Sequence, residues 1–241
     1  MATLYVIATP IGNAEDITFR AVRILGEVDA LACEDTRKTT FLFNKYNIAV
    51  PAIVFAYHEH NEQSAGKRIV DLLESGKNIA LCSNAGYPSI SDPGYRVIAD
   101  VASGNHRIEV IPGPSAAQAA LVMSGLPVSS YTFMGFPPRK SGQRKNFLSA
   151  EKAAPHTLIL YESPFRIHRL LGDAFDVLGN RRAAVCVELT KKFERIYRGW
   201  LAELNTQLDG KNIKGEITVV IAGNNKKFIK SSPAQDAQKV S

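Results

Sequence analysis

The sequence predicts an α/β protein with two domains and a parallel or mostly parallel sheet in the first. Short apolar runs alternate with amphipathic segments along the first half, which is typical of strand–helix–strand units with right-handed crossovers. Four of these runs end in loops of small and polar residues, at 9–13, 34–37, 83–94 and 112–116. Because parallel strands share one carboxyl edge, we expect the four loops on one rim of the sheet, where ligands bind in such folds.

The first domain should contain strands at 4–9, 29–33, 53–56, 78–82 and 108–111. Helices are expected at about 38–46 and from 116 to about 124, where apolar residues recur at helical spacing. Another helix should bury its apolar residues at 69–73 and end at Gly76. Asp16 is expected to cap the first helix. Asp92 should cap a helix that starts at Pro93, since proline suits the first helical position.

A break at Gly125-Leu126-Pro127 places the domain boundary between 117 and 130, which gives domains at 1–120 and 121–223. The second domain should contain strands at 131–136, 157–162, 184–190 and 216–223. Helices are expected at 164–178, with Phe175 facing inward, and at 200–208. Residues 224–241 are polar and rich in lysine, which predicts a mobile basic tail.

The composition is that of a globular protein, with 45% hydrophobic and 22% charged residues among 241. No apolar run reaches the roughly 18 residues of a membrane span, and the first residues suggest a strand and not a signal peptide. Three separate cysteines, each within an apolar run, favour a reducing, cytoplasmic location. The formal charge of +6 suits a polyanionic partner.

Several motifs are missing or ambiguous. The chain has no G-x-G-x-x-G after a strand and no P-loop, which disfavours dinucleotide enzymes and NTPases. Gly113-Pro114-Ser115 lacks the second glycine of a nucleophile elbow. His58-Glu59-His60 could be a solvated turn or a metal site, and we expect the turn and no metal. The basic stretch 139–145 could be a solvated helix start or a phosphate-contacting arm.

A set of motifs occurs in one order along residues 4–223. They are Thr9-Pro-Ile-Gly-Asn13, Glu34-Asp-Thr-Arg37, His58-Glu-His-Asn-Glu62, Ser83-Asn-Ala-Gly86, Ile90-Ser-Asp-Pro-Gly94, Pro112-Gly-Pro-Ser-Ala116, Gly135-Phe-Pro-Pro138, Tyr161-Glu-Ser163, Glu188-Leu-Thr-Lys191 and Lys214-Gly-Glu216. In these motifs the chain resembles the tetrapyrrole methylase superfamily of S-adenosylmethionine-dependent enzymes, and within it the branch that methylates small-subunit ribosomal RNA. The resemblance implies a class III methyltransferase fold, in which a parallel and a mixed sheet flank a cofactor cleft.

The resemblance also implies a homodimer that methylates the 2′-hydroxyl of a cytidine in the decoding region of 16S rRNA. It implies cofactor contacts from both domains, by Ile11, Asn84, Tyr87, Ser115, Ala116, Tyr161, Thr190 and Glu216. Two positions depart from the family pattern, because the family usually has Asp at Asn84 and Thr at Tyr87. Asparagine keeps a carbonyl acceptor but loses the charge, and the larger tyrosine could narrow the cleft.

Methyl transfer to a hydroxyl needs a group that takes the proton or stabilises the developing alkoxide. We expect Glu59, Arg37 and Glu162 near the acceptor. Alternatively, Glu34 and Asp35 could cap the helix that follows, and Arg37 could form a salt bridge with them. RNA phosphates would be contacted by Arg139, Lys140, Arg144, Lys145 and Arg166. Two alternatives stay open: a methylase of the same fold that acts on a tetrapyrrole, and an RNA-binding protein that has lost catalysis through Asn84 and Tyr87.

Overall fold

A computed structural model of the chain describes residues 2–104, 106–211 and 213–230. The chain divides into two compact units after Ser115, somewhat before the boundary expected at 120. The reason is α5 (Ala116–Ser124), which packs on the sheet of the second unit. In the described part of the chain, no helix is both long and apolar enough to cross a membrane.

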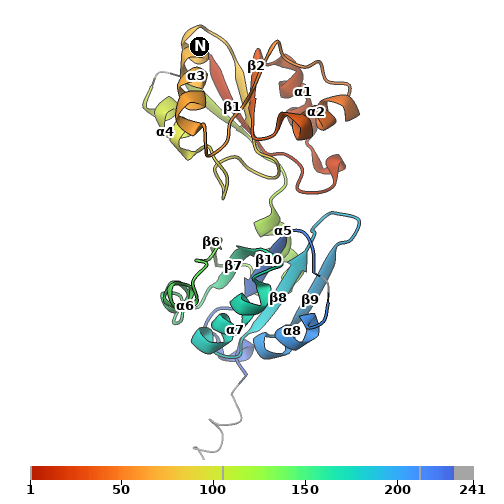
Figure 1. The fold of residues 1–241 in the computed structure, drawn as a ribbon, viewed down its shortest axis with the longest axis vertical. Helices are drawn as coiled ribbons and strands as arrows, with labels where there is room; N and C mark the ends of the chain where they lie inside the picture. The colour runs from red at the N-terminus through yellow and green to blue at the C-terminus, as the bar shows by residue number, and fades with distance from the viewer. Residues whose placement is uncertain (1, 105, 212, 231–241) are drawn as a thin grey trace, which may run out of the picture. The chain divides into compact units, whose positions relative to one another are not determined.

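The first unit is a parallel sheet covered by helices on both faces (Figure 1). Its strand order is β3-β2-β4-β1-β5. The strands are β1 (Thr3–Ile7), β2 (Ala30–Cys33), β3 (Ile53–Ala56), β4 (Ile79–Cys82) and β5 (Arg107–Ile111). The helices are η1 (Ala14–Asp16), α1 (Phe19–Glu27), α2 (Thr36–Lys45), α3 (Glu62–Glu74) and α4 (Tyr95–Ser103).

Alternate strand residues of the first unit serve two cores, as the twofold period of a strand requires. Leu4 and Val6 pack with α3 and α4 in one cluster, whereas Ile7 packs with α1 and α2 in the other. The continuous apolar runs therefore reflect burial on both faces, which is typical of parallel sheets. Because all strands run in one direction, the loops that follow them emerge at a single edge.

The expected helix starts of the first unit need correction. Asp16 lies in η1, and the cap of α1 is Thr18, whose hydroxyl accepts from the Ala21 N–H at 3.1 Å. Helix α4 starts at Tyr95 with Gly94 as its N-cap, so the expected cap by Asp92 is wrong. The backbone N–H of Ser89 donates to the Pro93 carbonyl at 3.1 Å, and this bond closes the preceding residues into a loop.

The second unit is a mixed sheet of order β6-β7-β10-β8-β9. Its strands are β6 (Tyr131–Gly135), β7 (Thr157–Glu162), β8 (Arg182–Val187), β9 (Arg195–Trp200) and β10 (Ile217–Ile221). β6 is parallel to β7, and β10 is antiparallel to both β7 and β8. Three helices, α6 (Ser141–Ser149), α7 (Ile167–Leu178) and α8 (Leu201–Leu208), share one core with the sheet (Figure 1).

Several expectations for the second unit were incomplete. The sequence did not predict α6 or β9, and Phe175 is not buried, since 37% of it is exposed. Part of the expected tail is ordered, because the Asn224 N–H donates to the Ala154 carbonyl at 2.7 Å and η2 (Lys226–Phe228) follows. The remainder of that tail, 231–241, lies outside the described residues.

Candidate active site

The loops after β1 and β4 are joined directly. Thr9 and Gly86 exchange two backbone hydrogen bonds of 2.9 Å, and the Thr9 hydroxyl donates to the Ser83 carbonyl at 3.1 Å. Gly86 has a φ of +73°, a conformation that glycine adopts without strain. The two loops thus form one connected surface at the carboxyl edge of the first sheet.

Tyr87 connects this surface to the loop after β5. Its hydroxyl accepts a hydrogen bond from the Gly113 N–H at 3.1 Å. Gly113 itself lies against Ala8, where an added Cβ would approach the Ala8 carbonyl oxygen to 3.1 Å. Ile11 is buried, and its Cγ2 lies 3.6 Å from the position a Cβ on Gly86 would take. Ile11 and Tyr87, both predicted at the cofactor site, therefore belong to one cluster.

Asn84 joins the loop after β4 to the loop after β2. Its backbone N–H donates to Glu34 Oε2 at 3.1 Å. Its side-chain oxygen, Oδ1, is buried and has no hydrogen-bond partner among the described residues. A buried carbonyl without a donor costs about 1–3 kcal/mol, so a ligand donor that reaches it would gain free energy. The sequence did not identify the role of Glu34 here, because the contact spans 50 residues.

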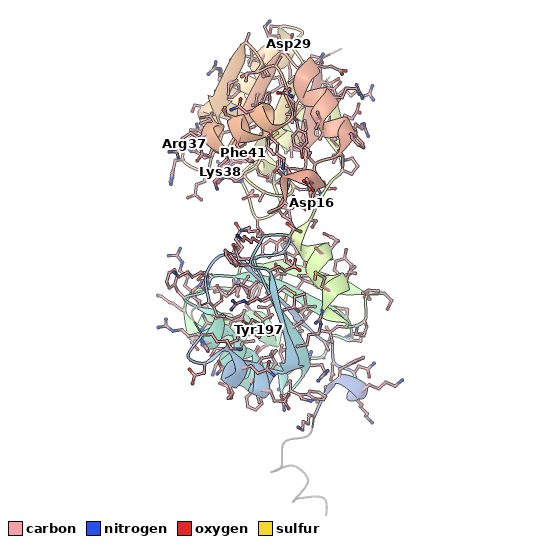
Figure 2. The ribbon with its side chains drawn as sticks, turned by 90° about the vertical axis from the view of Figure 1, so that its right-hand side faces the viewer. Asp16, Asp29, Arg37, Lys38, Phe41 and Tyr197 are labelled. Atoms are coloured by element: carbon pink, nitrogen blue, oxygen red, sulfur yellow. The ribbon has the colours of Figure 1, made fainter. Side chains whose placement is uncertain are left out.

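Arg37 is held by its neighbour. Its guanidinium donates Nε to Asp35 Oδ1 at 3.1 Å and pairs with Asp35 Oδ2 at 2.9 Å. The side-chain hydrogen bonds from Arg37 lower the pKa of Asp35 to about 2. Arg37 is nevertheless exposed, and it extends from α2 together with Lys38 and Phe41 (Figure 2). The structure therefore contains the salt bridge that was the alternative interpretation of this arginine.

Glu59 follows β3, the strand at the outer end of the sheet. Its side chain is exposed and lies 3.7 Å from the imidazole of His60. It lines an open groove of about 860 Å³, together with Glu62 and Arg96. Within the described residues, no group of three potential ligands is placed to hold a metal ion. Among the described residues, Glu59 makes no hydrogen bond or ion pair with Asn84.

Glu162 is the most enclosed carboxylate among the predicted site residues. Its Oε1 accepts from the Ser163 N–H at 2.8 Å and pairs with Arg166 at 2.5 Å. Its Oε2 is buried with no hydrogen-bond partner in the described chain. The pairing also corrects the expectation for Arg166, whose guanidinium is bound to Glu162 and mostly enclosed rather than displayed to RNA.

A second polar cluster lies where β8 ends and β10 begins. Lys191 Nζ contacts Glu188 Oε1 at 2.8 Å and Glu216 Oε2 at 3.1 Å. Although burial raises it, the pKa of Glu188 is lowered overall by the hydrogen bonds from Lys191 and the Glu216 N–H. Glu188 and Thr190 both have positive φ, at 54° and 63°. Strained backbone of this kind is concentrated at functional sites.

Tyr161 lies in an aromatic group. Its ring contacts Phe133 edge-on, with ring centres 4.9 Å apart, and Phe136 in the same way at 5.6 Å. Ser115 closes the first unit and Ala116 starts α5 of the second. Ile11, Asn84 and Tyr87 thus lie on connected loops of the first unit, and Tyr161, Thr190 and Glu216 lie at one edge of the second sheet.

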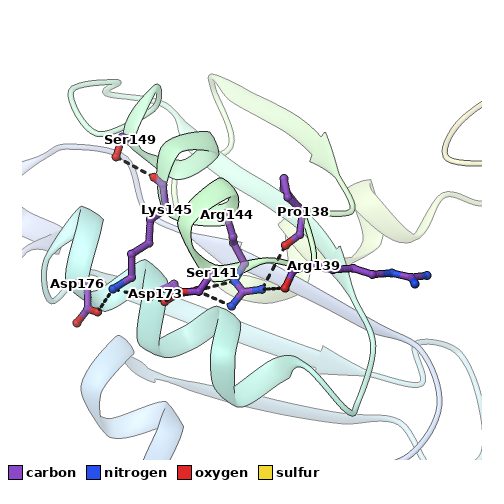
Figure 3. Close-up of polar contacts among 8 residues, drawn as sticks. All are labelled: Pro138, Arg139, Ser141, Arg144, Lys145, Ser149, Asp173 and Asp176. Carbon is purple, nitrogen blue, oxygen red and sulfur yellow. Dashed lines mark hydrogen bonds and ion pairs between the residues drawn. The ribbon is translucent and has the colours of Figure 1, made fainter.

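The basic stretch has a different role from the one expected for two of its members. Arg144 is buried, donating Nε to Asp173 Oδ2 at 2.7 Å and NH1 to the Pro138 and Arg139 carbonyls at 3.2 and 2.9 Å (Figure 3). Lys145 pairs with Asp176 at 2.6 Å. Arg144 therefore cannot contact RNA directly, and Lys145 is partly neutralised. Arg139 and Lys140 stay exposed.

Comparison with known proteins places the chain in a class of enzymes. The profile of the tetrapyrrole (corrin/porphyrin) methylases matches residues 3–205, and the chain belongs to this family. S-adenosylmethionine is the methyl donor of the family.

The chain is similar to proteins named ribosomal RNA small subunit methyltransferase I. The relative from Halalkalibacterium halodurans is 47% identical over 93% of this chain and 77% of its own length. The Bacillus subtilis relative is 43% identical over 93% of this chain and 76% of its own length. Among solved structures, diphthine synthase shares the fold at a TM-score of 0.71 and 14% identity, covering 92% of this chain and 90% of its own. A cobalt precorrin-4 methyltransferase shares the fold at a TM-score of 0.69 and 17% identity, covering 91% of this chain and 94% of its own.

Proposed function

We propose that this chain transfers the methyl group of S-adenosylmethionine to the ribose 2′-hydroxyl of a cytidine in the decoding region of 16S rRNA. The similarity to small-subunit rRNA methyltransferases supports the substrate class. The observation that carries the proposed site is the distribution of unpartnered atoms. In the described part of the chain only three buried side-chain polar atoms lack a hydrogen-bond partner, and two of them are Asn84 Oδ1 and Glu162 Oε2.

The residues fit the methyl donor in one specific respect. Asn84 Oδ1 is a buried hydrogen-bond acceptor without a donor among the described residues, and the amino and ribose hydroxyl groups of the cofactor are donors. Ile11, Tyr87, Ser115 and Ala116 would hold the cofactor with Asn84, and the resemblance makes Tyr161, Thr190 and Glu216 further candidates for cofactor contacts. The cofactor supplies a methyl group on a sulfonium, which is open to in-line displacement by an oxygen nucleophile.

Glu162 is the best candidate for the proton acceptor. Its Oε1 is occupied by Ser163 and Arg166, which fix the carboxylate, while Oε2 is free to accept a hydroxyl proton. A positioned base of this type contributes about 10²–10⁴-fold to the rate. Glu59 is exposed and Arg37 is engaged by Asp35, so we give them supporting roles near the RNA. A homodimer in the cytoplasm, acting on the assembled small subunit, completes the proposal.

The test is transfer of labelled methyl from S-adenosylmethionine to small subunits that lack the modification. We expect label on one cytidine, mapped by the resistance of its linkage to alkaline cleavage. Glu162→Gln should lower the rate about 10²–10⁴-fold with unchanged cofactor affinity, whereas Glu74→Gln, the matched control at an exposed position at the end of α3, should change it little. Asn84→Ala should weaken cofactor binding about 2- to 10-fold. Cofactor binding without label on rRNA would refute the substrate, and no cofactor binding would favour the non-catalytic alternative.

A further inference from the structure

Three phenylalanines of the second unit are exposed, and each follows a different strand. Phe136 comes after β6, Phe165 after β7 and Phe193 after β8, with exposed fractions of 56%, 92% and 67%. Single exposed apolar residues are normal on protein surfaces. Three on adjacent loops need a reason, because contiguous exposed apolar surface marks interaction sites. We call these three residues the aromatic edge.

The sheet topology brings the three loops to one side. β6 is parallel to β7, and both β7 and β8 are antiparallel to β10, so β6, β7 and β8 all run in one direction. Ile217 pairs with both Glu162 and Val187, which aligns the ends of β7 and β8 across the sheet. At about 4.8 Å between strands, the three loops emerge within about 14 Å of one another.

The charged residues around the aromatic edge favour a polyanion. Four carboxylates lie there: Glu162 pairs with Arg166, Glu188 and Glu216 share Lys191, and Glu194 accepts from the Thr190 N–H. The exposed basic side chains near the aromatic edge make no ion pair among the described residues. These are Arg139, Lys140, Lys192 and Lys214. Together with Arg166 and Lys191 they make six basic side chains against four carboxylates, so this edge carries a net positive charge.

We propose that the aromatic edge is a stacking platform for unpaired RNA bases, with the surrounding lysines and arginines contacting the phosphates. Proteins bind single-stranded RNA by this combination of aromatic faces and a basic groove. A contact between two copies of this chain fits less well, because lysine is depleted from protein–protein interfaces. The inference rests on the proposed function, and it adds that the target nucleotide is held in an unstacked, single-stranded segment.

Phe165→Ala and Phe193→Ala in the full chain test this inference, since both rings are exposed and their loss should not disturb folding. The probe is a short, unpaired, fluorescein-labelled oligoribonucleotide followed by anisotropy. We expect each variant to bind about 5- to 150-fold more weakly, which is the effect of losing one stacked base, and Phe165→Trp to restore binding. Phe19→Ala is the matched control, because Phe19 is 96% exposed but lies in the first unit beside Glu15 and Asp16.

Two further readouts separate stacking from charge. An oligomer with abasic sugars should bind the Phe165→Ala variant and the unsubstituted chain equally, because no base is present to stack. Lys192→Ala should lower the slope of log affinity against log salt by about 1, whereas Phe165→Ala should leave the slope unchanged. Equal oligoribonucleotide affinity of Phe165→Ala, Phe193→Ala and the unsubstituted chain would overturn the inference.

The inference and the proposed function fail in distinguishable ways. If the chain methylates small subunits and the phenylalanine variants bind RNA normally, the stacking platform is wrong and the proposed function stands. If the chain methylates no rRNA but Phe165→Ala still weakens oligoribonucleotide binding, the platform stands and the substrate is a different RNA. A change in sedimentation mass caused by Phe165→Ala or Phe193→Ala would overturn the platform in favour of contact between copies.

Discussion

Removing the Asp173 carboxylate should strongly destabilise the second unit. Asp173 accepts from Arg144 Nε at 2.7 Å and from the Ser141 hydroxyl at 2.9 Å, and it pairs with Arg144 NH2 at 2.5 Å (Figure 3). The Arg144 side chain is only 2% exposed. Asp173→Asn would leave the Arg144 guanidinium enclosed without a compensating charge. Removal of one partner of a buried ion pair lowers the free energy of unfolding by about 3–5 kcal/mol.

Urea unfolding followed by tryptophan fluorescence is the assay. The single tryptophan, Trp200, ends β9 in the second unit and reports on that unit. The pair of substitutions Arg144→Met with Asp173→Leu removes both charges, so we expect the double variant to be more stable than Asp173→Asn. A double-mutant cycle completed by the single variants Arg144→Met and Asp173→Leu then gives the coupling energy between the two side chains.

Asp176→Asn is the matched control. Asp176 also pairs with a basic residue of α6, Lys145, but its side chain is 54% exposed. Exposed pairs contribute about 0–1 kcal/mol, so this change should be nearly silent. If Asp173→Asn costs no more than Asp176→Asn, the charge on Arg144 is solvated in solution and the argument from burial is wrong.

Three further predictions concern the backbone and titratable groups. Gly215→Ala should cost about 1–3 kcal/mol in urea unfolding, because the residue has a φ of +87° and its new Cβ would overlap the Glu188 carboxylate. Asp35 should stay ionised at pH 3 in an NMR titration, since Arg37 lowers its pKa to about 2; its stabilisation is present above about pH 4 and disappears as pH falls toward 2. Cys186 should resist maleimide at pH 8 in the folded chain, because burial raises its pKa to about 11.

Each of these predictions has a control. Gly210 also has a positive φ, of 67°, but nothing lies within 4 Å of an added Cβ, so Gly210→Ala should cost less than Gly215→Ala. In Arg37→Ala the pKa of Asp35 should return toward 3.8. Denaturant should make Cys186 reactive. Equal losses of unfolding free energy in Gly210→Ala and Gly215→Ala would contradict the overlap with Glu188. An unchanged pKa of Asp35 in Arg37→Ala would contradict the role of the salt bridge. Rapid maleimide labelling of Cys186 in the native chain would contradict its burial.

The order of strands and helices in the first unit could be predicted because its apolar runs are buried on both faces and therefore stand out. The positions of α6 and β9 could not be predicted in this way. In α6 only Arg144 and Leu148 are buried, so the helix carries no apolar period. In β9 the fully buried residue is Gly199, whose missing side chain leaves no apolar signal.

The candidate site was predictable only in part. The family resemblance pointed to Asn84 and Tyr87, and the need for a proton acceptor pointed to Glu162. The partner of a charged side chain, however, depends on residues distant in the sequence. Arg144 and Asp173 are 29 residues apart, and α6 and α7 bring them together. The basic stretch alone could therefore not indicate that Arg139 and Lys140 face solvent, whereas Arg144 is buried and donates to the backbone carbonyls of the loop.

The central position of β1 has a consequence for synthesis on the ribosome. β1 is made first, yet it pairs only with β4 and β5, and its last residue, Ile7, aligns with Cys82. At about 5–20 residues per second, roughly 4–15 s pass before that partner is made. Through this interval the backbone of β1 has no neighbouring strand, and the apolar side chains of Leu4, Val6 and Ile7 lack part of their core. The nascent first unit therefore carries an apolar strand without a paired neighbour until the fourth strand is made.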